Sequence, residues 1–210
     1  SKKHSANDED PDCLNDQELK DLDHEDFSIE IKPVILEYFQ NGDTIEVIDH
    51  LKCYNIYKLK PQLVSYLIQL ALDHNNTTKE LTSRLLRDFA LELFAERDFI
   101  FGFDLLLKNI NDLTLDNPDA CDKIGIFIAR AIADKVLSKE YLDRFFNDEE
   151  NQAGLPDAVN DSRVAKAIET ARVLVNMNDH LYHLSHVWGN KGGFLAVKEL
   201  TDKINELIQE

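Results

Sequence analysis

From Phe27 onward, apolar residues recur every three or four positions, the spacing that places them on one side of an α-helix. Each run begins near a Ser, Thr, Asp, Asn or Pro and ends at turn residues, as helices do. Helices are therefore expected from Phe27 to Gln40, Asp43 to Leu51, Pro61 to Ala71, Thr77 to Leu93, Phe99 to Lys108, Asn117 to Ile132, Ser138 to Phe145, and 162–177.

The same spacing predicts which side chains are buried. The inward-facing positions are expected to be Ile31, Ile35 and Phe39, then Ile45, Ile48 and Leu51, then Leu63, Val64, Leu67, Ile68 and Ala71, then Leu81, Leu85, Phe89 and Leu93, then Ile124, Phe127, Ile128, Ala131 and Ile132, and finally Val164, Ile168, Ala171 and Val175. Several polar residues are expected to cap these helices. The expected caps and first-turn residues are Asp43 with Glu46, Thr77 with Glu80, Asn117 followed by Pro118, Ser138, and Pro33 in the first turn of its helix.

Residues 99–108, FIFGFDLLLK, carry alternating aromatic side chains that a strand would also show. Nothing nearby offers a partner strand, so a helix is the better interpretation. Short helices joined by turns of a few residues indicate antiparallel helical hairpins stacked on one another. The sequence therefore predicts an all-α fold.

The regions outside the periodic part have different compositions. Residues 1–26 are acidic and lack apolar periodicity, which predicts a mostly disordered lead-in. Residues 178–193 are interpreted as a linker, because they end in the glycine-rich stretch GNKGG. Residues 194–210 have apolar positions four apart, which predicts a helix that either begins a second domain or folds back on the first.

The charge balance restricts the class of partner. Forty acidic residues against twenty-three basic ones give a formal net charge of −17. Direct nucleic-acid binding is disfavoured, since it normally needs a clustered basic face. A basic protein partner is favoured by charge complementarity, although acidity could also serve solubility alone. No run of apolar residues is long enough to span a membrane, and three widely spaced cysteines indicate reduced thiols in the cytoplasm or nucleus.

The sequence offers little for catalysis or cofactor binding. His180, His183 and His186 are spaced three apart, but no carboxylate or cysteine follows at metal-ligand spacing, so exposed linker histidines are favoured. The GNKGG stretch lacks the rest of a phosphate-binding loop. Cys121 near a helix start could have a lowered pKa, but packing is the simpler role. No catalytic residue, metal site or cofactor is predicted, and an unrelated helical enzyme is a remote third hypothesis.

The segment NINDLTLDNPDA (109–120) is the strongest candidate for a binding site. Asp112 and Asp116 are four apart, so a helical turn would place both carboxylates on one side. Leu113 and Leu115 would anchor the backbone between them. With Asn117 as the cap and Pro118 as the first helical residue, Asp116 would point outward beside a positive helix N-terminus. The alternative is that Asp116 serves only that helix dipole.

Three stretches, ILEYFQNGDTIEVIDHLK (35–52), ELTSRLLRDF (80–89) and LLLKNINDLTLDNPDACDKIGIFIARAIAD (105–134), resemble the MA-3 (MA3) domain family. The resemblance covers about 27–177 and implies a HEAT-like stack of helical hairpins. VWGNKGG (187–193) resembles the tryptophan-glycine linker that follows the first of two such domains in one branch of the family.

The resemblance also implies a function. Members of that branch bind the DEAD-box RNA helicase translation initiation factor 4A, block its engagement of RNA and lower cap-dependent initiation. The implied partner-binding residues are Asp112, Asp116, Leu113, Asn117 and Pro118, with Asp112 standing where a longer Glu is common. The alternative is an activating scaffold of the initiation factor 4G type, which recruits the helicase. A monomer is expected, without direct nucleic-acid or membrane binding.

Overall fold

The computed structural model describes residues 19–22, 24–146, 161–177, 184 and 186–189. Its helices are α1 (His24–Asn41), α2 (Thr44–Lys52), α3 (Lys60–Leu72), α4 (Asn76–Glu92), α5 (Glu96–Lys108), α6 (Ile110–Asp116), α7 (Ala120–Ala133), α8 (Glu140–Asp143) and α9 (Ser162–Asn176). Two short strands, β1 (Lys20–Asp21) and β2 (Tyr54–Asn55), pair in parallel. The expected linker lies mostly outside the described residues, as do residues 1–18 of the lead-in and the whole expected helix over 194–210.

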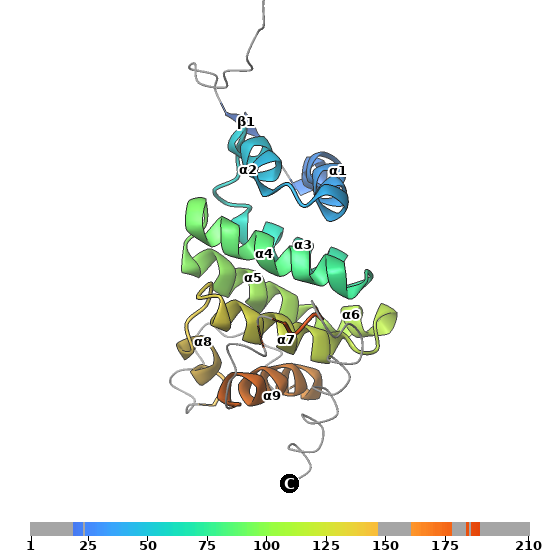
Figure 1. The fold of residues 1–210 in the computed structure, drawn as a ribbon, viewed down its shortest axis with the longest axis vertical. Coiled ribbons are helices and arrows are strands. Elements are labelled where there is room, and N and C mark those ends of the chain that lie inside the picture. Colours follow the sequence, from blue (N-terminus) through green and yellow to red (C-terminus); the bar gives the residue numbers. More distant parts are fainter. Residues whose placement is uncertain (1–18, 23, 147–160, 178–183, 185, 190–210) are drawn as a thin grey trace, which may run out of the picture.

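The helices stack in successive layers, and the all-α prediction is confirmed (Figure 1). Helices α1 and α2 lie at one end of the stack, α3 to α5 in the middle, and α7 and α9 at the other end. Helix α3 packs along α5, and α7 packs along α9. In the part of the chain that the structure describes, no helix is long and apolar enough to cross a membrane.

One continuous core runs through the stack. Aromatic rings form its centre: Phe89 stacks on Phe94 with centroids 4.8 Å apart, and Phe94 contacts Phe99 at 5.7 Å. Phe99 and Phe103 are buried one helical turn apart, whereas Phe101 points to solvent. Residues 99–108 therefore form a helix as predicted, because burial follows the helical period and not strand alternation.

Two glycines allow the closest helix contacts. A Cβ on Gly102 of α5 would lie 2.6 Å from Val64 Cβ of α3, and one on Gly125 of α7 would lie 2.5 Å from the carbonyl oxygen of Ala167 of α9. Real Cβ atoms do not approach other atoms this closely. The missing side chains thus set how near α5 lies to α3 and α7 to α9.

Helix α1 begins earlier than its apolar pattern indicated. It starts at His24, so Pro33 lies in its interior and the prediction that Pro33 occupies the first turn is wrong. Proline lacks an N–H group, so the carbonyl of Ile29 has no helical partner. Ile29 is exposed, and water can satisfy that carbonyl. The helix ends at Asn41, where Gly42 has a φ of 70°, as the Asn-Gly pair predicted.

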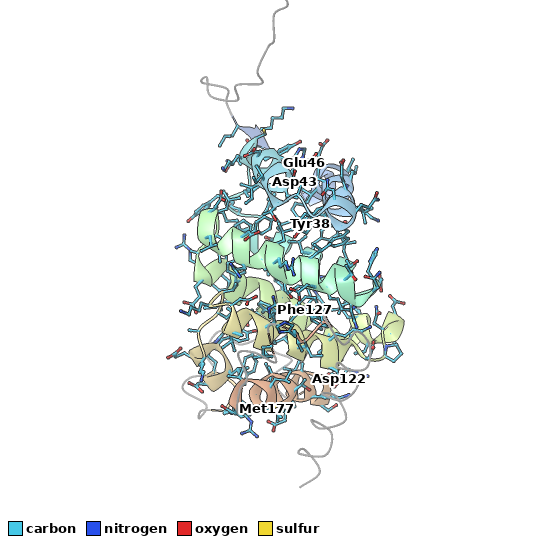
Figure 2. All side chains as sticks on the ribbon, viewed as in Figure 1. Tyr38, Asp43, Glu46, Asp122, Phe127 and Met177 are labelled. Atoms are coloured by element: carbon cyan, nitrogen blue, oxygen red, sulfur yellow. The ribbon has the colours of Figure 1, made fainter. Side chains whose placement is uncertain are left out.

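Asp43 caps α2 as predicted, accepting hydrogen bonds from the backbone N–H groups of Ile45 and Glu46 (Figure 2). The Glu46 side chain does not complete a capping box; it accepts from the side chain of Asn41. Ile45 is exposed, and Val47 takes its expected place in the core. Helix α2 is thus rotated slightly about its own axis relative to the predicted orientation.

Helix α4 is capped by Asn75, whose Oδ1 accepts from the N–H of Thr78, so the predicted capping box of Thr77 and Glu80 is wrong. Glu80 is instead buried within α4. Similarly, Ser138 does not cap α8, which starts after Lys139; the Ser138 N–H donates to Glu96 Oε1 at 2.7 Å. At α4 a different local residue caps the helix, and Glu80 pairs with Arg130 of α7.

Candidate functional site

Helix α6 presents two carboxylates to solvent. Asp112 and Asp116 are both exposed. They lie four residues apart within α6, so they share one side of the helix. Among the described residues, neither carboxylate has a side-chain hydrogen bond or an ion pair. A cationic partner could therefore bind them without breaking an existing contact.

The rest of the chain holds α6 in place. Ile110 is fully buried at the start of the helix, and Leu113 is half-buried against the core. Arg163 of α9 donates from its NH1 group to Asn111 Oδ1 at 2.8 Å. A short helix would not be stable alone, so these tertiary contacts fix the direction of the two carboxylates.

The predicted cap after α6 is wrong. Asn117 is the C-terminal cap of α6, and its Nδ2 donates to Asp73 Oδ1 at 2.7 Å. Helix α7 begins at Ala120, so Pro118 lies in the turn and is not the first helical residue. Asp116 is accordingly the last residue of α6. Leu115, expected to anchor the backbone, is 79% exposed.

Two lysines of helices α4 and α7 are already engaged. Lys123 Nζ lies 2.8 Å from Asp119 Oδ1. Lys79 is buried and donates to the carbonyl of His74. Burial, with the charge of Lys123 nearby, lowers the pKa of Lys79 to about 8. Neither amine forms an ion pair with Asp112 or Asp116.

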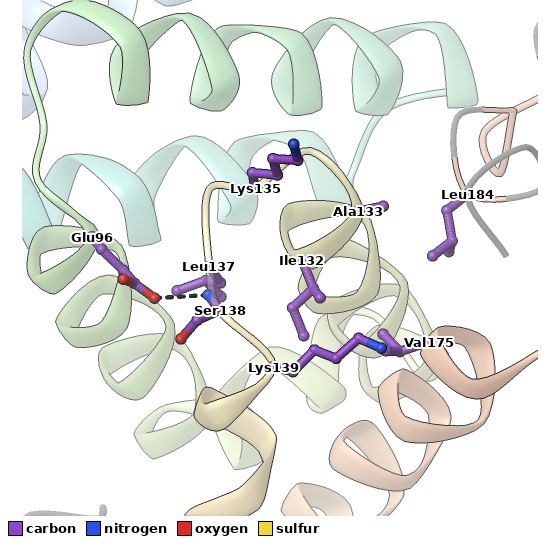
Figure 3. Close-up of a pocket in the computed structure, with 9 residues that line it drawn as sticks. All are labelled: Glu96, Ile132, Ala133, Lys135, Leu137, Ser138, Lys139, Val175 and Leu184. Atoms are coloured by element: carbon purple, nitrogen blue, oxygen red, sulfur yellow. Dashed lines mark hydrogen bonds between the residues drawn. The ribbon is translucent and has the colours of Figure 1, made fainter.

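A separate cavity of about 350 Å³ opens between the α7–α8 connection and the end of α9 (Figure 3). Its described lining is Glu96, Ile132, Ala133, Lys135, Leu137, Ser138, Lys139, Val175 and Leu184. Glu96 is the carboxylate of this set, and the Ser138 N–H occupies it. Among these described lining residues, no hydrogen bond joins the Ser138 hydroxyl to Glu96, Lys135 or Lys139. Among the described residues, no cluster of His, Cys, Asp and Glu is placed to hold a metal ion.

Cys121 packs in the core, as the simpler interpretation held. Burial raises the pKa of its thiol, so the location near the start of α7 does not activate it. Of the three spaced histidines, His180 and His183 lie outside the described residues. His186 is partly buried beside the tryptophan-glycine segment, where the Gly189 N–H donates to its carbonyl oxygen at 2.8 Å.

Trp188 makes buried contacts that the sequence did not predict. Its side chain is 3% exposed, its Nε1 donates to Ser83 Oγ of α4 at 3.0 Å, and its ring centroid lies 4.6 Å from that of Phe127. Val187 beside it is buried as well. The tryptophan-glycine segment is thus packed into the domain between α4 and α7. The sequence signals were the single tryptophan and the resemblance of VWGNKGG (187–193) to a tryptophan-glycine linker, and neither indicated which helices the ring contacts.

Ser83→Ala is expected to lower the free energy of unfolding by about 1–3 kcal/mol, because it leaves the buried Trp188 N–H without an acceptor. Urea denaturation followed by circular dichroism measures the change. Ser83→Ala should cost less in a Trp188→Phe background, where no donor remains. Equal costs in both backgrounds would show that the hydrogen bond does not stabilise the docked segment.

Comparison with known proteins identifies a family and several relatives of this chain. The MA3 domain model matches residues 27–138, more than half of the chain. The chain belongs to the MA3 domain family. It is 33% identical over 203 residues to programmed cell death protein 4 of Gallus gallus, covering 97% of this chain and 41% of that protein. The Homo sapiens protein of that name is 32% identical over the same span.

The chain is also similar to MA3 domain-containing translation regulatory factor 1 of Arabidopsis thaliana. The identity is 34% over 177 residues, which cover 84% of this chain and 24% of that protein. The chain spans less than half the length of these relatives. The family resemblance read from residues 35–134 is thus confirmed, together with the HEAT-like stack that it implied.

Proposed function

We propose that this MA3 domain is a non-catalytic module that regulates translation by binding the DEAD-box helicase translation initiation factor 4A and inhibiting its engagement of RNA. Relatives named as translation regulatory factors support the process. The observation that carries the site is the pair of exposed, unpaired carboxylates on α6. Asp112 and Asp116 make the contacts, and Leu113, Asn117 and Pro118 hold them in position.

The inhibition has a simple electrostatic basis. A helicase presents Arg and Lys side chains to RNA phosphates. Carboxylates at a fixed spacing can occupy those side chains and exclude RNA by charge and by steric overlap. The net charge of −17 speeds the encounter with such a basic surface. The same charge disfavours direct RNA binding by the chain itself.

In a titration against initiation factor 4A, Asp112→Ala and Asp116→Ala are each expected to weaken binding at least tenfold, about 1.4 kcal/mol. Each removes a carboxylate from the contact and leaves its cationic partner unpaired. Glu37→Ala on α1 is the matched control, since Glu37 is also exposed and without an ion pair in the described residues. It should leave the affinity unchanged. Higher salt should weaken wild-type binding more than binding of either α6 variant.

Other results would redirect the proposal. Tight binding that neither α6 substitution weakens would mean that the helicase is the partner but that the contact lies elsewhere on the chain. If the chain does not bind initiation factor 4A, the helicase is not its partner. If the chain binds but stimulates helicase-driven unwinding, the alternative, an activating scaffold of the initiation factor 4G type, is correct.

We also propose a cellular location and an oligomeric state for the chain. Action on initiation places the chain in the cytoplasm, and its reduced thiols suit both cytoplasm and nucleus. We expect a monomer, because self-repulsion at a net charge of −17 opposes self-association. Imaging of a tagged chain and light scattering test the two statements separately.

A further inference from the structure

Exposed aromatic residues are gathered on one side of the stack, away from α6. Among the described residues, the exposed large aromatic side chains are Tyr57 at 64%, Phe101 at 56% and Phe146 at 53%. All three lie close to arginines. Together they form a surface that we call the aromatic–arginine strip: Tyr57, Arg97, Phe101, Arg144, Phe146 and Arg172.

The strip is continuous across helices α5 and α8. Arg97 NH2 donates to Tyr57 Oη at 3.2 Å, and Arg97 Cζ lies 6.0 Å from the centre of that ring. Phe101 follows Arg97 by one helical turn on α5, and Asp104 follows on the same side. Arg144, just after α8, bonds Asp104 through NH2 at 3.0 Å. Phe101 therefore lies between the two arginines.

The far end of the strip is formed by the α8 region and α9. Arg144 Cζ lies 5.4 Å from the ring centre of Tyr141 and 6.0 Å from that of Phe145. Phe146 follows directly and lies 5.4 Å from Arg172 Cζ of α9. Guanidinium groups thus contact several of the rings.

Two unpaired cations lie near the Tyr57 end of the aromatic–arginine strip. Among the described residues, no carboxylate lies within ion-pair distance of Arg97 or Lys58. Arg97 contacts the exposed Tyr57 ring, and Lys58 follows Tyr57 directly in the chain. These two cations fit a ligand that brings its own negative charge.

We propose that the aromatic–arginine strip is a second docking surface, which binds an acidic protein segment carrying apolar or aromatic side chains. Carboxylates of the segment pair with Arg97 and Lys58, and its apolar side chains pack on Phe101. Tyr and Arg are the residues most enriched where binding energy concentrates in protein interfaces.

A protein ligand fits better than single-stranded RNA. Arg144 and Arg172 are already paired with Asp104 and Glu169, so they offer little to phosphates. Arg97 lies over the Tyr57 ring, a position that a stacked base would need. The net charge of −17 repels a polyanion as long as RNA more than a short acidic segment.

The strip and α6 lie at opposite ends of helix α5. Figure 1 shows the start of α5 and α8 on one side of the stack and α6 on the other. Helix α5 has 13 residues, which corresponds to a length of roughly 20 Å. An acidic segment on the strip and a basic partner on α6 could therefore be bound at the same time. The two surfaces differ in charge and select different partners.

A fluorescein-labelled random copolymer of glutamate and tyrosine is a suitable probe, with polyglutamate and oligouridylate as companions. We expect fluorescence anisotropy to show that the full chain binds the Glu-Tyr copolymer at least about tenfold more tightly than either companion. Arg97→Glu and Phe101→Ser should each reduce that affinity about tenfold or more. Lys32→Glu, the same charge change at an exposed site on α1, is the control and should have little effect.

Three results would overturn the proposal. One is an absence of copolymer binding, another is equal loss in Lys32→Glu and Arg97→Glu, and the third is preferential binding of oligouridylate. Arg97 and Phe101 are exposed, so both variants should keep the wild-type thermal transition. Asp112→Ala should retain copolymer binding, and Arg97→Glu should retain helicase binding. Failure of this proposal is thereby distinguishable from failure of the function proposed for α6.

Discussion

Replacing Arg130 with methionine is expected to lower the free energy of unfolding by about 3–5 kcal/mol. Arg130 of α7 is 5% exposed and makes a two-pronged ion pair with Glu80 of α4, with N–O distances of 2.8 and 3.1 Å. Its Nε also donates to Asp134 Oδ2 at 2.7 Å. Methionine would fill much of the volume but leave the buried Glu80 and the partly buried Asp134 carboxylates without this partner.

Arg84→Met is the matched control for this effect. Arg84 contacts the same Glu80 at 2.9 Å, but its side chain is about half exposed. The substitution should cost less than about 1 kcal/mol, because water replaces the lost ion pair. Chemical denaturation of both variants gives the comparison. Similar costs for the two would mean that burial of the Arg130–Glu80 pair is not what links α4 to α7.

The helical faces were predictable because their signal is local. The five positions expected inside α3 (Leu63, Val64, Leu67, Ile68 and Ala71) are all buried, as are the four expected inside α9 (Val164, Ile168, Ala171 and Val175). Side chains three and four residues apart share a face in any helix, so sequence spacing alone decides which ones can be buried together. The same spacing predicted that Asp112 and Asp116 share one side of a helix, and both lie in α6.

Contacts between distant residues were not predictable in this way. Glu80 has the spacing of a capping-box residue, yet it pairs with Arg130, 50 residues later. Trp188 bonds Ser83 across 105 residues, although its neighbourhood has linker composition. Asn117 looked like a cap for α7 but bonds Asp73 at the end of α3. A polar side chain has several possible partners, and the tertiary fold decides among them.

The aromatic–arginine strip was predictable only in part. Phe101 and Arg97 could be assigned to one side of a helix from their spacing. That Tyr57 and Phe146 lie on the same surface depends on how α8 and the α2–α3 connection pack beside α5. A sequence pattern does not contain that information, so the surface emerged only from the contacts of Arg97 and Arg144.

Replacing Gly125 with alanine is expected to destabilise the chain by about 1–3 kcal/mol or more, by forcing α9 away from α7. The added Cβ would lie 2.5 Å from the carbonyl oxygen of Ala167 and 2.7 Å from Thr170 Cβ. The first of these is a backbone atom, which cannot move without shifting the helix. Because α7 and α9 form the most extensive helix pair in the described structure, that shift disturbs much of the lower core.

The direction of the Gly125→Ala effect identifies its cause. Alanine in place of glycine inside a helix would otherwise stabilise it by about 1 kcal/mol. Ala165→Gly, at an exposed position of α9, measures that propensity difference in this same protein. Thermal and urea denaturation should show both substitutions as destabilising, although they change the residue in opposite directions. Stabilisation by Gly125→Ala would mean that the two helices can separate slightly at little cost, and that close approach is not what requires glycine at this position.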